Sequence, residues 1–447
     1  MVARPAGVDQ LQQLVQLANA HAWPLVPVSS APPHGKGALA CADEHLLVDL
    51  SSWKEIQRVD RRNRVCLIEP GVTYPELLTA LRPFGMTVPM PLAPRSTKSV
   101  AAAVMDREPS TWPNKQWDIS DPVASTELNF GTGDRFRTGA AGGPGTLEQQ
   151  RAVGGAQKSP MGPSQTEFQR VVQGAQGCLG LFTWITVRTE LLPALEEPRL
   201  IGAEALDQII PLVYEAERPS LGEHCFILDR SAAAMLMTYP APQNFAATRK
   251  DLPPFICLQN VAGFERLPRE RVAYQVQDIT EMASRHGLKL CSSLGPLSAR
   301  DLLARATSPC GPRDWRHALR GHCLSIFFLT TLDRAPSFLE LAKKAARDLP
   351  DPESLGTYLQ PIVQNHACHL ELMFPYDPNN PTEVDRFRRF EEELVRELLE
   401  AGAFFSRPYG ASERLAFASN PLNFAVLTKV KKIFDPNRVL HPGKFGL

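Results

Sequence analysis

The sequence has no net charge, because its 48 Lys and Arg residues balance its 48 Asp and Glu residues. No global electric field therefore draws the protein to nucleic acid or to an acidic lipid surface, and a small ligand is the expected partner. No apolar run approaches the roughly 18 residues that a membrane span needs, and the first residues lack the apolar core of a signal peptide. We expect a cytoplasmic protein with no membrane span and no nucleic-acid partner.

Paired cysteine motifs are also missing. The nine cysteines are scattered, mostly in apolar runs, which is typical of reduced core residues. Since no Cys-x-x-Cys or Cys-x-x-Cys-His occurs, the sequence predicts neither an iron–sulfur ligand set nor a c-type haem. A Gly-x-Gly-x-x-Gly that opens a helix after a strand is absent, which argues against a Rossmann dinucleotide site. Any electron that the protein removes from a substrate leaves through an organic cofactor, oxygen or another protein.

The chain of 447 residues is too long for one compact core and suits two domains. After Leu192-Pro193 it changes to repeated strand-helix-strand patterns, which predict an α+β domain on an antiparallel sheet. The predicted strands lie at 254–259, 288–292, 324–330 and 368–374, and the predicted helices at about 268–286, 337–348 and 381–400. Residues 139–165 have little apolar periodicity, which indicates a lid, an oligomer contact or disorder.

One turn in the first domain has the composition of a ligand-binding turn. An apolar strand at 65–68 passes through Glu69-Pro70-Gly71-Val72-Thr73-Tyr74 into a helical pattern. Such a turn leaves backbone N–H groups beside whatever lies over it, so an anionic or dipolar cofactor edge would be held there. An ordinary strand-to-helix connection is the competing interpretation.

Three further stretches suit a cofactor. The loop at 29–37 combines serines, glycines, His34 and Lys36, which offer the donors and the positive charge that a pyrophosphate needs. A run of small residues from Ser99 permits the close approach of a flat ring, although alanines also favour a plain helix. Glycines at 174, 177 and 180 join two apolar runs and let backbone amides face a phosphate.

With the terminal Asp435-Pro436-Asn437 and Pro442-Gly443-Lys444, these stretches resemble, in order and spacing, the vanillyl-alcohol oxidase and p-cresol methylhydroxylase flavoprotein family. The resemblance covers nearly the whole chain. It implies FAD as the cofactor, an α+β FAD-binding domain at 1–193, a cap domain at 194–405, and a segment at 406–447 that returns to the FAD domain. The cofactor-binding residues it implies are Ser29, Ser30, His34, Gly35, Lys36, Gly37, Pro70, Gly71, Val72, Ser99, Gly174, Gly177, Gly180, Thr183, His369, His441 and Pro442.

The chain looks closest to the phenol-oxidising branch, in which a Tyr after Pro-Gly-Val-Thr and an Arg near the end of the cap hold a phenolate. Those positions correspond to Tyr74 and Arg407. The branch has a second Tyr where this chain has Ser406, so Tyr409 is the expected substitute, and Asp118 is the expected acid near flavin N5. A buried phenol that ionises needs a hydrogen-bond donor and a fixed cation. Its benzylic carbon then gives a hydride to flavin N5.

Two other functions stay open. The wider superfamily includes 2-hydroxyacid dehydrogenases, although their usual acidic and histidine pair after the cap is absent from residues 406–410. The altered loops also suit a non-catalytic flavin subunit of an electron-transfer complex. If 366–369 is a strand, His366 and His369 point to opposite faces and bind no common metal, which leaves His369 for the flavin edge, a covalent flavin link or a solvent-facing role. The resemblance also implies a homo-oligomer, a small aromatic substrate and either oxygen or a protein as electron acceptor.

Overall fold

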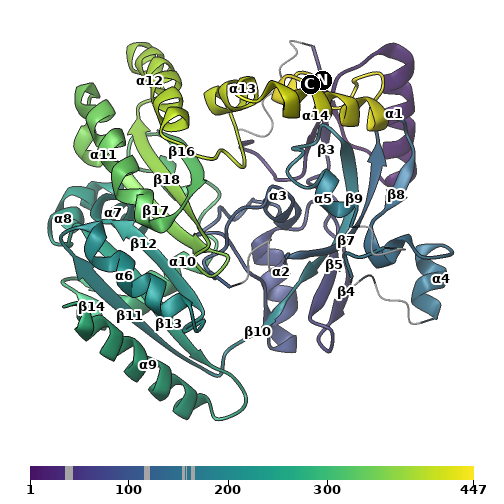
Figure 1. The fold of residues 1–447 in the computed structure, drawn as a ribbon. Helices are drawn as coiled ribbons and strands as arrows, with labels where there is room; N and C mark the ends of the chain where they lie inside the picture. Colours follow the sequence, from purple (N-terminus) through teal and green to yellow (C-terminus); the bar gives the residue numbers. More distant parts are fainter. Residues whose placement is uncertain (36–43, 115–120, 154–156, 158, 163–166) are drawn as a thin grey trace.

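The computed structural model describes residues 1–35, 44–114, 121–153, 157, 159–162 and 167–447. The chain forms two halves that lie side by side (Figure 1), one around a five-stranded sheet and the other around a six-stranded sheet. Both ends of the chain belong to the first half, where Leu25 bridges Leu440. The α+β architecture predicted from the sequence is therefore confirmed.

The described part of the first half contains three sheets and the helices around them, and the smallest sheet pairs β6 with β10. A small parallel sheet has the order β1-β3-β2, and the larger antiparallel sheet has the order β4-β5-β9-β7-β8. The strands are β1 (Val2–Ala3), β2 (Leu25–Val28), β3 (Leu46–Asp49), β4 (Ile56–Asp60), β5 (Val65–Ile68), β6 (Met86–Thr87), β7 (Val123–Phe130), β8 (Arg135–Arg137), β9 (Gly180–Arg188) and β10 (Glu190–Leu191). The helices are α1 (Val8–His21), α2 (Tyr74–Leu81), α3 (Val100–Met105), α4 (Leu147–Ala152), α5 (Gln169–Val172), α13 (Ala411–Ala418) and α14 (Pro421–Phe434).

The second half is built on an antiparallel sheet with the order β11-β13-β12-β17-β18-β16. Its strands are β11 (Leu195–Ala203), β12 (His224–Asp229), β13 (Phe255–Gly263), β16 (His322–Thr330), β17 (Gly356–Ile362) and β18 (Ala367–Tyr376), and a separate hairpin joins β14 (Ser293–Leu294) to β15 (Leu297–Ser298). The helices are α6 (Leu206–Glu217), α7 (Arg230–Thr238), α8 (Phe245–Lys250), α9 (Pro268–Arg285), α10 (Ala299–Ala306), α11 (Ala335–Ala345) and α12 (Pro381–Glu400). Because β11 begins at Leu195, we propose the division into residues 1–193, 194–405 and 406–447.

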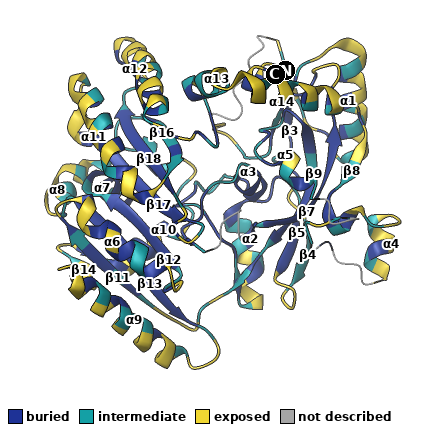
Figure 2. Cartoon of the chain, viewed as in Figure 1, coloured by how far each residue is buried: buried dark blue, intermediate teal, exposed yellow. Residues whose placement is uncertain are grey.

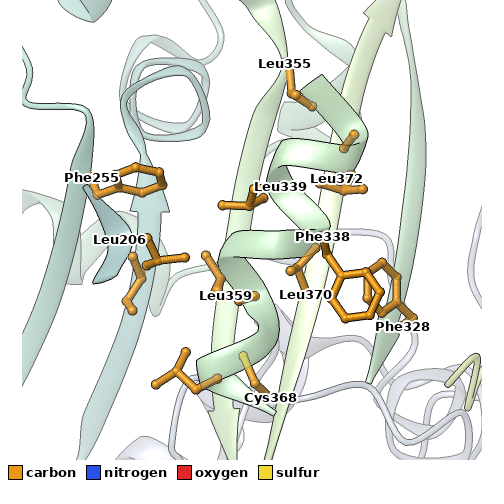
Figure 3. Close-up of a cluster of buried hydrophobic side chains, with 14 of the residues drawn as sticks. Leu206, Phe255, Phe328, Phe338, Leu339, Leu355, Leu359, Cys368, Leu370 and Leu372 are labelled. Carbon is orange, nitrogen blue, oxygen red and sulfur yellow. The ribbon is translucent and has the colours of Figure 1, made fainter. Parts of the chain in front are cut away.

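Alternation along β18 separates two layers of the second half. Cys368, Leu370 and Leu372 point into a core that includes Phe338 and Leu339 of α11 (Figure 3). Met373 belongs to a different core, with residues of α7 and α10 on the opposite face of the sheet. Figure 2 shows the strands of this sheet buried and the outer side of α9 exposed. The period of two in β18 thus fixes which side chains face α11 and which face the layer that contains α7 and α10.

Most predicted elements of the second half exist, and one expected strand there was wrong. Residues 288–292 form no strand, although Cys291 makes an isolated bridge to Leu200. The segment 139–153 is not a plain loop, because it contains α4, whose Thr146 cap and Gln149 bond reciprocally. Local capping chemistry formed that helix despite the weak apolar periodicity.

Candidate active site between the two sheets

The turn between β5 and α2 is held by a close approach of backbones at Gly71. A Cβ atom on Gly71 would lie 2.6 Å from the carbonyl oxygens of both Ser51 and Trp53. The Gly71 N–H donates to the Trp53 carbonyl at 2.7 Å. Thr73 then caps α2, and its backbone N–H and its hydroxyl donate to Glu76 Oε2 at 2.9 and 2.7 Å. The helix therefore starts at Tyr74, directly after the turn.

This tight packing gives a stability prediction. Gly71→Ala is expected to lower the free energy of unfolding by about 1–3 kcal/mol, since the added methyl group meets backbone atoms that cannot rotate away. Gly143→Ala is the matched control, because its Cβ would lie 3.4 Å from the Ala140 carbonyl oxygen, an ordinary contact. Urea unfolding of both variants checks the difference. Equal stabilities would show that the β5–α2 turn relaxes around the methyl group.

The Ser-rich loop, the turn and the start of α3 meet at Ser99. Its hydroxyl donates to the Pro70 carbonyl, and it caps α3 through the N–H of Ala102 at 3.1 Å. Ser29 Oγ lies 3.2 Å from Ser99 Oγ, and the Ser99 N–H donates to Ser30 Oγ at 3.0 Å. Residues predicted from three separate stretches of sequence are thus brought together.

The glycine segment at 174–180 meets the end of the chain. Gly177 has a φ of +83° and no room for a Cβ, which would lie 2.4 Å from Pro27 Cγ. His441 is fully buried, with Nδ1 at 3.0 Å from the Gln176 carbonyl oxygen and its backbone N–H on the Leu25 carbonyl at 2.7 Å. By contrast, a Cβ on Gly174 would meet nothing within 4 Å. The backbone at Gly174 therefore borders open space beside a rigid junction.

A cluster of charged groups lies where the residues that follow α3 meet the segment around Arg407. Arg407 Nη1 lies 3.6 Å from Asp106 Oδ2 and 3.8 Å from Glu108 Oε1, and the Arg407 side chain is 8% exposed. The Tyr409 hydroxyl donates to Asp106 Oδ2 at 2.8 Å. Burial raises the pKa of Asp106, while Arg407 opposes that rise. Lys98 Nζ also pairs with Glu108.

Tyr74 has a buried hydroxyl with no hydrogen-bond partner in the described part of the chain. Its side chain is fully buried. Burial, and after it the charge of Glu108, raises the pKa of Tyr74 well above its ordinary value. Since a buried hydroxyl without a partner costs free energy, this group is suited to a ligand that supplies the partner.

The sheet side of the site is aromatic. His369 of β18 is 3% exposed, and its ring lies 5.8 Å from that of Phe327 and 5.7 Å from that of Tyr358. The Arg407 guanidinium lies 4.4 Å from the centre of the Phe327 ring. Burial, followed by the charges of Arg407 and Arg316, lowers the pKa of His369, so its imidazole is neutral. The described structure thus places His369 inside the protein rather than facing solvent.

The comparisons with known proteins agree with this arrangement. A family model described as an FAD binding domain matches residues 1–139, and the model of the C-terminal domain of FAD linked oxidases matches residues 329–445. The flavoprotein subunit of 4-cresol dehydrogenase (hydroxylating) from Pseudomonas putida is 21% identical over 467 residues, covering 98% of this chain and 86% of that protein. The solved structure of p-cresol methylhydroxylase with substrate bound has a TM-score of 0.81 at 18% identity and covers 100% of this chain and 88% of that one. The chain belongs to the vanillyl-alcohol oxidase and p-cresol methylhydroxylase family.

Two further relatives match over similar lengths, and the first of them is named for a different class of substrate. D-2-Hydroxyglutarate dehydrogenase from Stutzerimonas stutzeri (strain A1501) is 21% identical over 454 residues, covering 98% of this chain and 89% of that protein. The structure of 4-ethylphenol oxidase from Gulosibacter chungangensis has a TM-score of 0.80 at 18% identity, covering 100% of this chain and 88% of that one. As a member of this family, the protein is a flavin-dependent oxidoreductase with FAD as its cofactor.

The residues present fit FAD at several points. Gly71 allows close packing against the backbone of Ser51 and Trp53, and Gly177 allows close packing against the Pro27 ring, whereas Gly174 borders open space. At the turn after β5, the hydroxyls of Ser29, Ser30 and Ser99 form a cluster of neutral hydrogen-bonding groups. FAD bound there supplies the hydride acceptor, and the protein supplies the groups that hold and orient the flavin.

Several predicted cofactor residues are placed differently from this cluster. Gly180 is the first residue of β9, where a Cβ would lie 2.3 Å from a Leu128 methyl group. Thr183 donates to Glu127 Oε1 at 2.8 Å within the sheet. His34 and Gly35 are exposed, and Pro442 directly follows His441. Lys36, Gly37 and Asp118 lie outside the described residues. The roles of all these residues in binding FAD stay predictions.

Asp106 and Glu108 are site residues that the sequence analysis missed. They follow the small-residue run of α3. The sequence analysis interpreted that run as a contact surface for a flat ring and did not consider the two carboxylates after it. The signal available was a pair of carboxylates immediately after an apolar helix, in a stretch that precedes Trp112. Among the described residues, no group of three or more His, Cys, Asp or Glu side chains could hold a metal ion.

Proposed function

We propose that this flavoprotein oxidises a neutral para-substituted phenol or aromatic alcohol, giving a hydride from the benzylic carbon to flavin N5. The main observation behind this proposal is that the buried Tyr74 hydroxyl has no hydrogen-bond partner among the described residues. It sits at the first position of α2, immediately after the turn at Pro70 to Val72. A phenol oxygen would accept the hydrogen bond that this hydroxyl lacks, and a phenolate would accept it more strongly.

The charge around Arg407 supports this substrate over a 2-hydroxy acid. Arg407 already lies within 4 Å of two carboxylates, Asp106 and Glu108. A substrate carboxylate placed there would add a third negative charge in a buried region, which is costly. Among the relatives, the names of 4-cresol dehydrogenase and 4-ethylphenol oxidase agree with a phenol, whereas D-2-hydroxyglutarate dehydrogenase represents the second candidate.

The proposal includes the finer properties that accompany the phenol-oxidising branch. These are a cytoplasmic location, a homo-oligomer, and oxygen or an acceptor protein as the electron acceptor. No helix of the described chain is long and apolar enough to cross a membrane. A catalytically inactive flavin subunit of an electron-transfer complex is the third candidate, because the relative from Pseudomonas putida is itself named a flavoprotein subunit.

Anaerobic reduction of the flavin by a panel of compounds tests the proposal. A para-alkylphenol is expected to bleach the flavin, and D-lactate or D-2-hydroxyglutarate is expected to leave it oxidised. Rapid reduction by a 2-hydroxy acid with no response to phenols would overturn the proposal in favour of the second candidate. A flavin that no compound of the panel reduces would favour the electron-transfer subunit.

Two site variants make the test specific. Tyr74→Phe and Arg407→Lys are each expected to slow reduction by the para-alkylphenol about 10- to 100-fold, because each removes a hydrogen bond to a charged oxygen worth about 1.5–3 kcal/mol. Tyr274→Phe is the matched control, since Tyr274 is 65% exposed on α9. Stopped-flow absorbance measures all three. An unchanged rate in Tyr74→Phe would show that its hydroxyl does not reach the substrate.

A further inference from the structure

Glu108 lies where the two predicted phenol-binding groups come within electrostatic range of one carboxylate. Its Oε1 is 3.8 Å from Arg407 Nη1 and pairs with Lys98 Nζ. Its charge also acts on the Tyr74 hydroxyl. The side chain is 18% exposed, so water screens these interactions only partly. Glu108 thus lies within electrostatic range of both Tyr74 and Arg407, which belongs to the segment 406–447.

The two carboxylates beside Arg407 are not equivalent. Asp106 has both oxygens engaged, Oδ1 by Gln176 Nε2 at 3.2 Å and Oδ2 by the Tyr409 hydroxyl at 2.8 Å. Glu108 bonds through Oε1, and within the described residues no side chain donates a hydrogen bond to its Oε2. Asp106 is therefore the fixed anchor of Tyr409 and Arg407. Glu108 is the carboxylate with an oxygen available to a ligand.

We propose that Glu108 accepts the phenolic proton of the substrate, an inference that rests on the proposed function. The phenol O–H bond breaks, its electron pair stays on the phenol oxygen, and the proton forms a new bond to a Glu108 carboxylate oxygen. FAD, when bound, would supply the acceptor for the benzylic C–H pair as a hydride, which would leave the substrate as a quinone methide. Protons and electrons balance with no further reactant.

This assignment explains how Arg407, which is already paired with two carboxylates, can stabilise a bound phenolate. Before the transfer, Arg407 faces the charges of Asp106 and Glu108. After it, Arg407 faces Asp106 and the phenolate, while Glu108 is neutral. The number of buried negative charges is unchanged, so the site ionises its ligand without the cost of an additional buried charge. An already anionic substrate gains nothing from such an exchange, so the site selects neutral phenols.

The pH dependence of flavin reduction tests the role of Glu108. Glu108→Gln is expected to slow anaerobic flavin reduction by a para-alkylphenol at least about 100-fold at pH 7. The rate of the variant is expected to approach that of the wild type as the pH nears the ordinary phenol pKa of about 10. At that pH the substrate arrives already ionised. Glu108→Asp keeps a proton acceptor at a changed position, so it is expected to keep flavin reduction at pH 7 with a shifted pH profile. Glu265→Gln, 79% exposed in its side chain, is the control.

Binding of a chromogenic nitrophenol gives a readout that needs no turnover. Wild-type protein is expected to bind it as the yellow phenolate at a pH where Glu108→Gln binds it as the neutral phenol. If Glu108→Gln fails to retain FAD, the nitrophenol titration is repeated with Glu108→Asp and the wild-type protein. The apparent pKa of the bound phenol is then expected to differ between these two proteins. No difference in the ionisation of the bound phenol would overturn the assignment.

The outcomes separate this inference from the proposed function. If phenols reduce the wild-type flavin and Glu108→Gln reacts equally fast, or is slowed by the same factor at every pH, Glu108 is not the proton acceptor and the proposed function stands. If no phenol reduces the wild-type flavin at any pH, the proposed function fails, and the inference fails with it.

Discussion

Lys431→Met is expected to lower the free energy of unfolding by about 3–5 kcal/mol, because it leaves a buried charge without its partner. Lys431 of α14 is 1% exposed, and its Nζ donates to Asp435 Oδ2 and to the Cys178 and Leu440 carbonyls, each at 2.6 Å. Asp435 has no exposed surface. Methionine preserves the length of the side chain while removing all three bonds, so the loss reports the charge rather than a cavity.

The same change is expected to weaken the retention of FAD. Asp435 also accepts the N–H groups of Val439 and Leu440 at 3.0 and 2.8 Å, which fixes the segment that leads to His441. That histidine borders the Gln176–Gly177 backbone. Loosening the C-terminal segment therefore disturbs one wall of the predicted cofactor site. Release of flavin fluorescence on heating measures this effect alongside unfolding.

The neighbouring lysine provides a matched control. Lys432 is exposed on the same helix, so Lys432→Met is expected to change stability by no more than about 0.5 kcal/mol. The double variant Lys431→Met/Asp435→Asn is expected to recover part of the loss, since it removes the stranded charge. If Lys431→Met and Lys432→Met prove equally stable, the buried ion pair contributes nothing and the C-terminal segment is held by its apolar contacts alone.

Local signals in the sequence were sufficient where the chemistry is local. Helix α12 begins at Pro381, as predicted for residues 381–400, because its Asn380 cap accepts the Glu383 N–H without help from other parts of the chain. The turn before Tyr74 was likewise predictable, since a Pro-Gly turn and a capping box are short-range features. The strand expected at 288–292 failed because a short apolar run specifies no partner, and only Cys291 found one.

The charge arrangement of the site depended on distant contacts. Tyr74 and Arg407 could be named from their motifs, but the pairing of Tyr409 with Asp106 joins residues 303 positions apart. No periodicity or spacing relates such residues. The resemblance therefore named Tyr74 and Arg407 as the predicted donor and cation. Folding places two carboxylates within 4 Å of that predicted cation, which its motif does not indicate.

The second large effect is expected at the bidentate ion pair on the sheet face of the site. Arg316 Nε and Nη2 donate to Glu371 Oε1 and Oε2 at 2.8 and 2.9 Å, and the two side chains are 15% and 7% exposed. Asp314 Oδ1 lies 3.4 Å from Arg316 Nη1, and the guanidinium packs 4.5 Å from the Trp315 ring centre. Glu371 and Asp314 together raise the pKa of Arg316 above its ordinary value, so the guanidinium is always charged.

Arg316→Met is therefore expected to cost about 3–5 kcal/mol of unfolding free energy, because it strands two carboxylates in the interior. Arg316→Met/Glu371→Gln is expected to restore part of that loss. The control is Arg388→Met, whose partner Asp385 lies 3.5 Å away with both side chains mostly exposed, and whose effect is expected to stay near 0–1 kcal/mol. Chemical denaturation of the FAD-bound protein measures all three.

The electrostatic consequence separates a structural ion pair from one that tunes the site. Arg316 is one of the charges that lower the pKa of His369, after burial and Arg407. Removing it is expected to raise the pKa of His369, and NMR titration of that imidazole follows the change. Arg316→Met could destabilise the protein no more than Arg388→Met and leave the pKa of His369 unchanged. That result would show that water screens the ion pair between Arg316 and Glu371. The sheet face of the site would then be wetter than its exposed fractions indicate, and the argument that Arg407 can face no third anion would weaken with it.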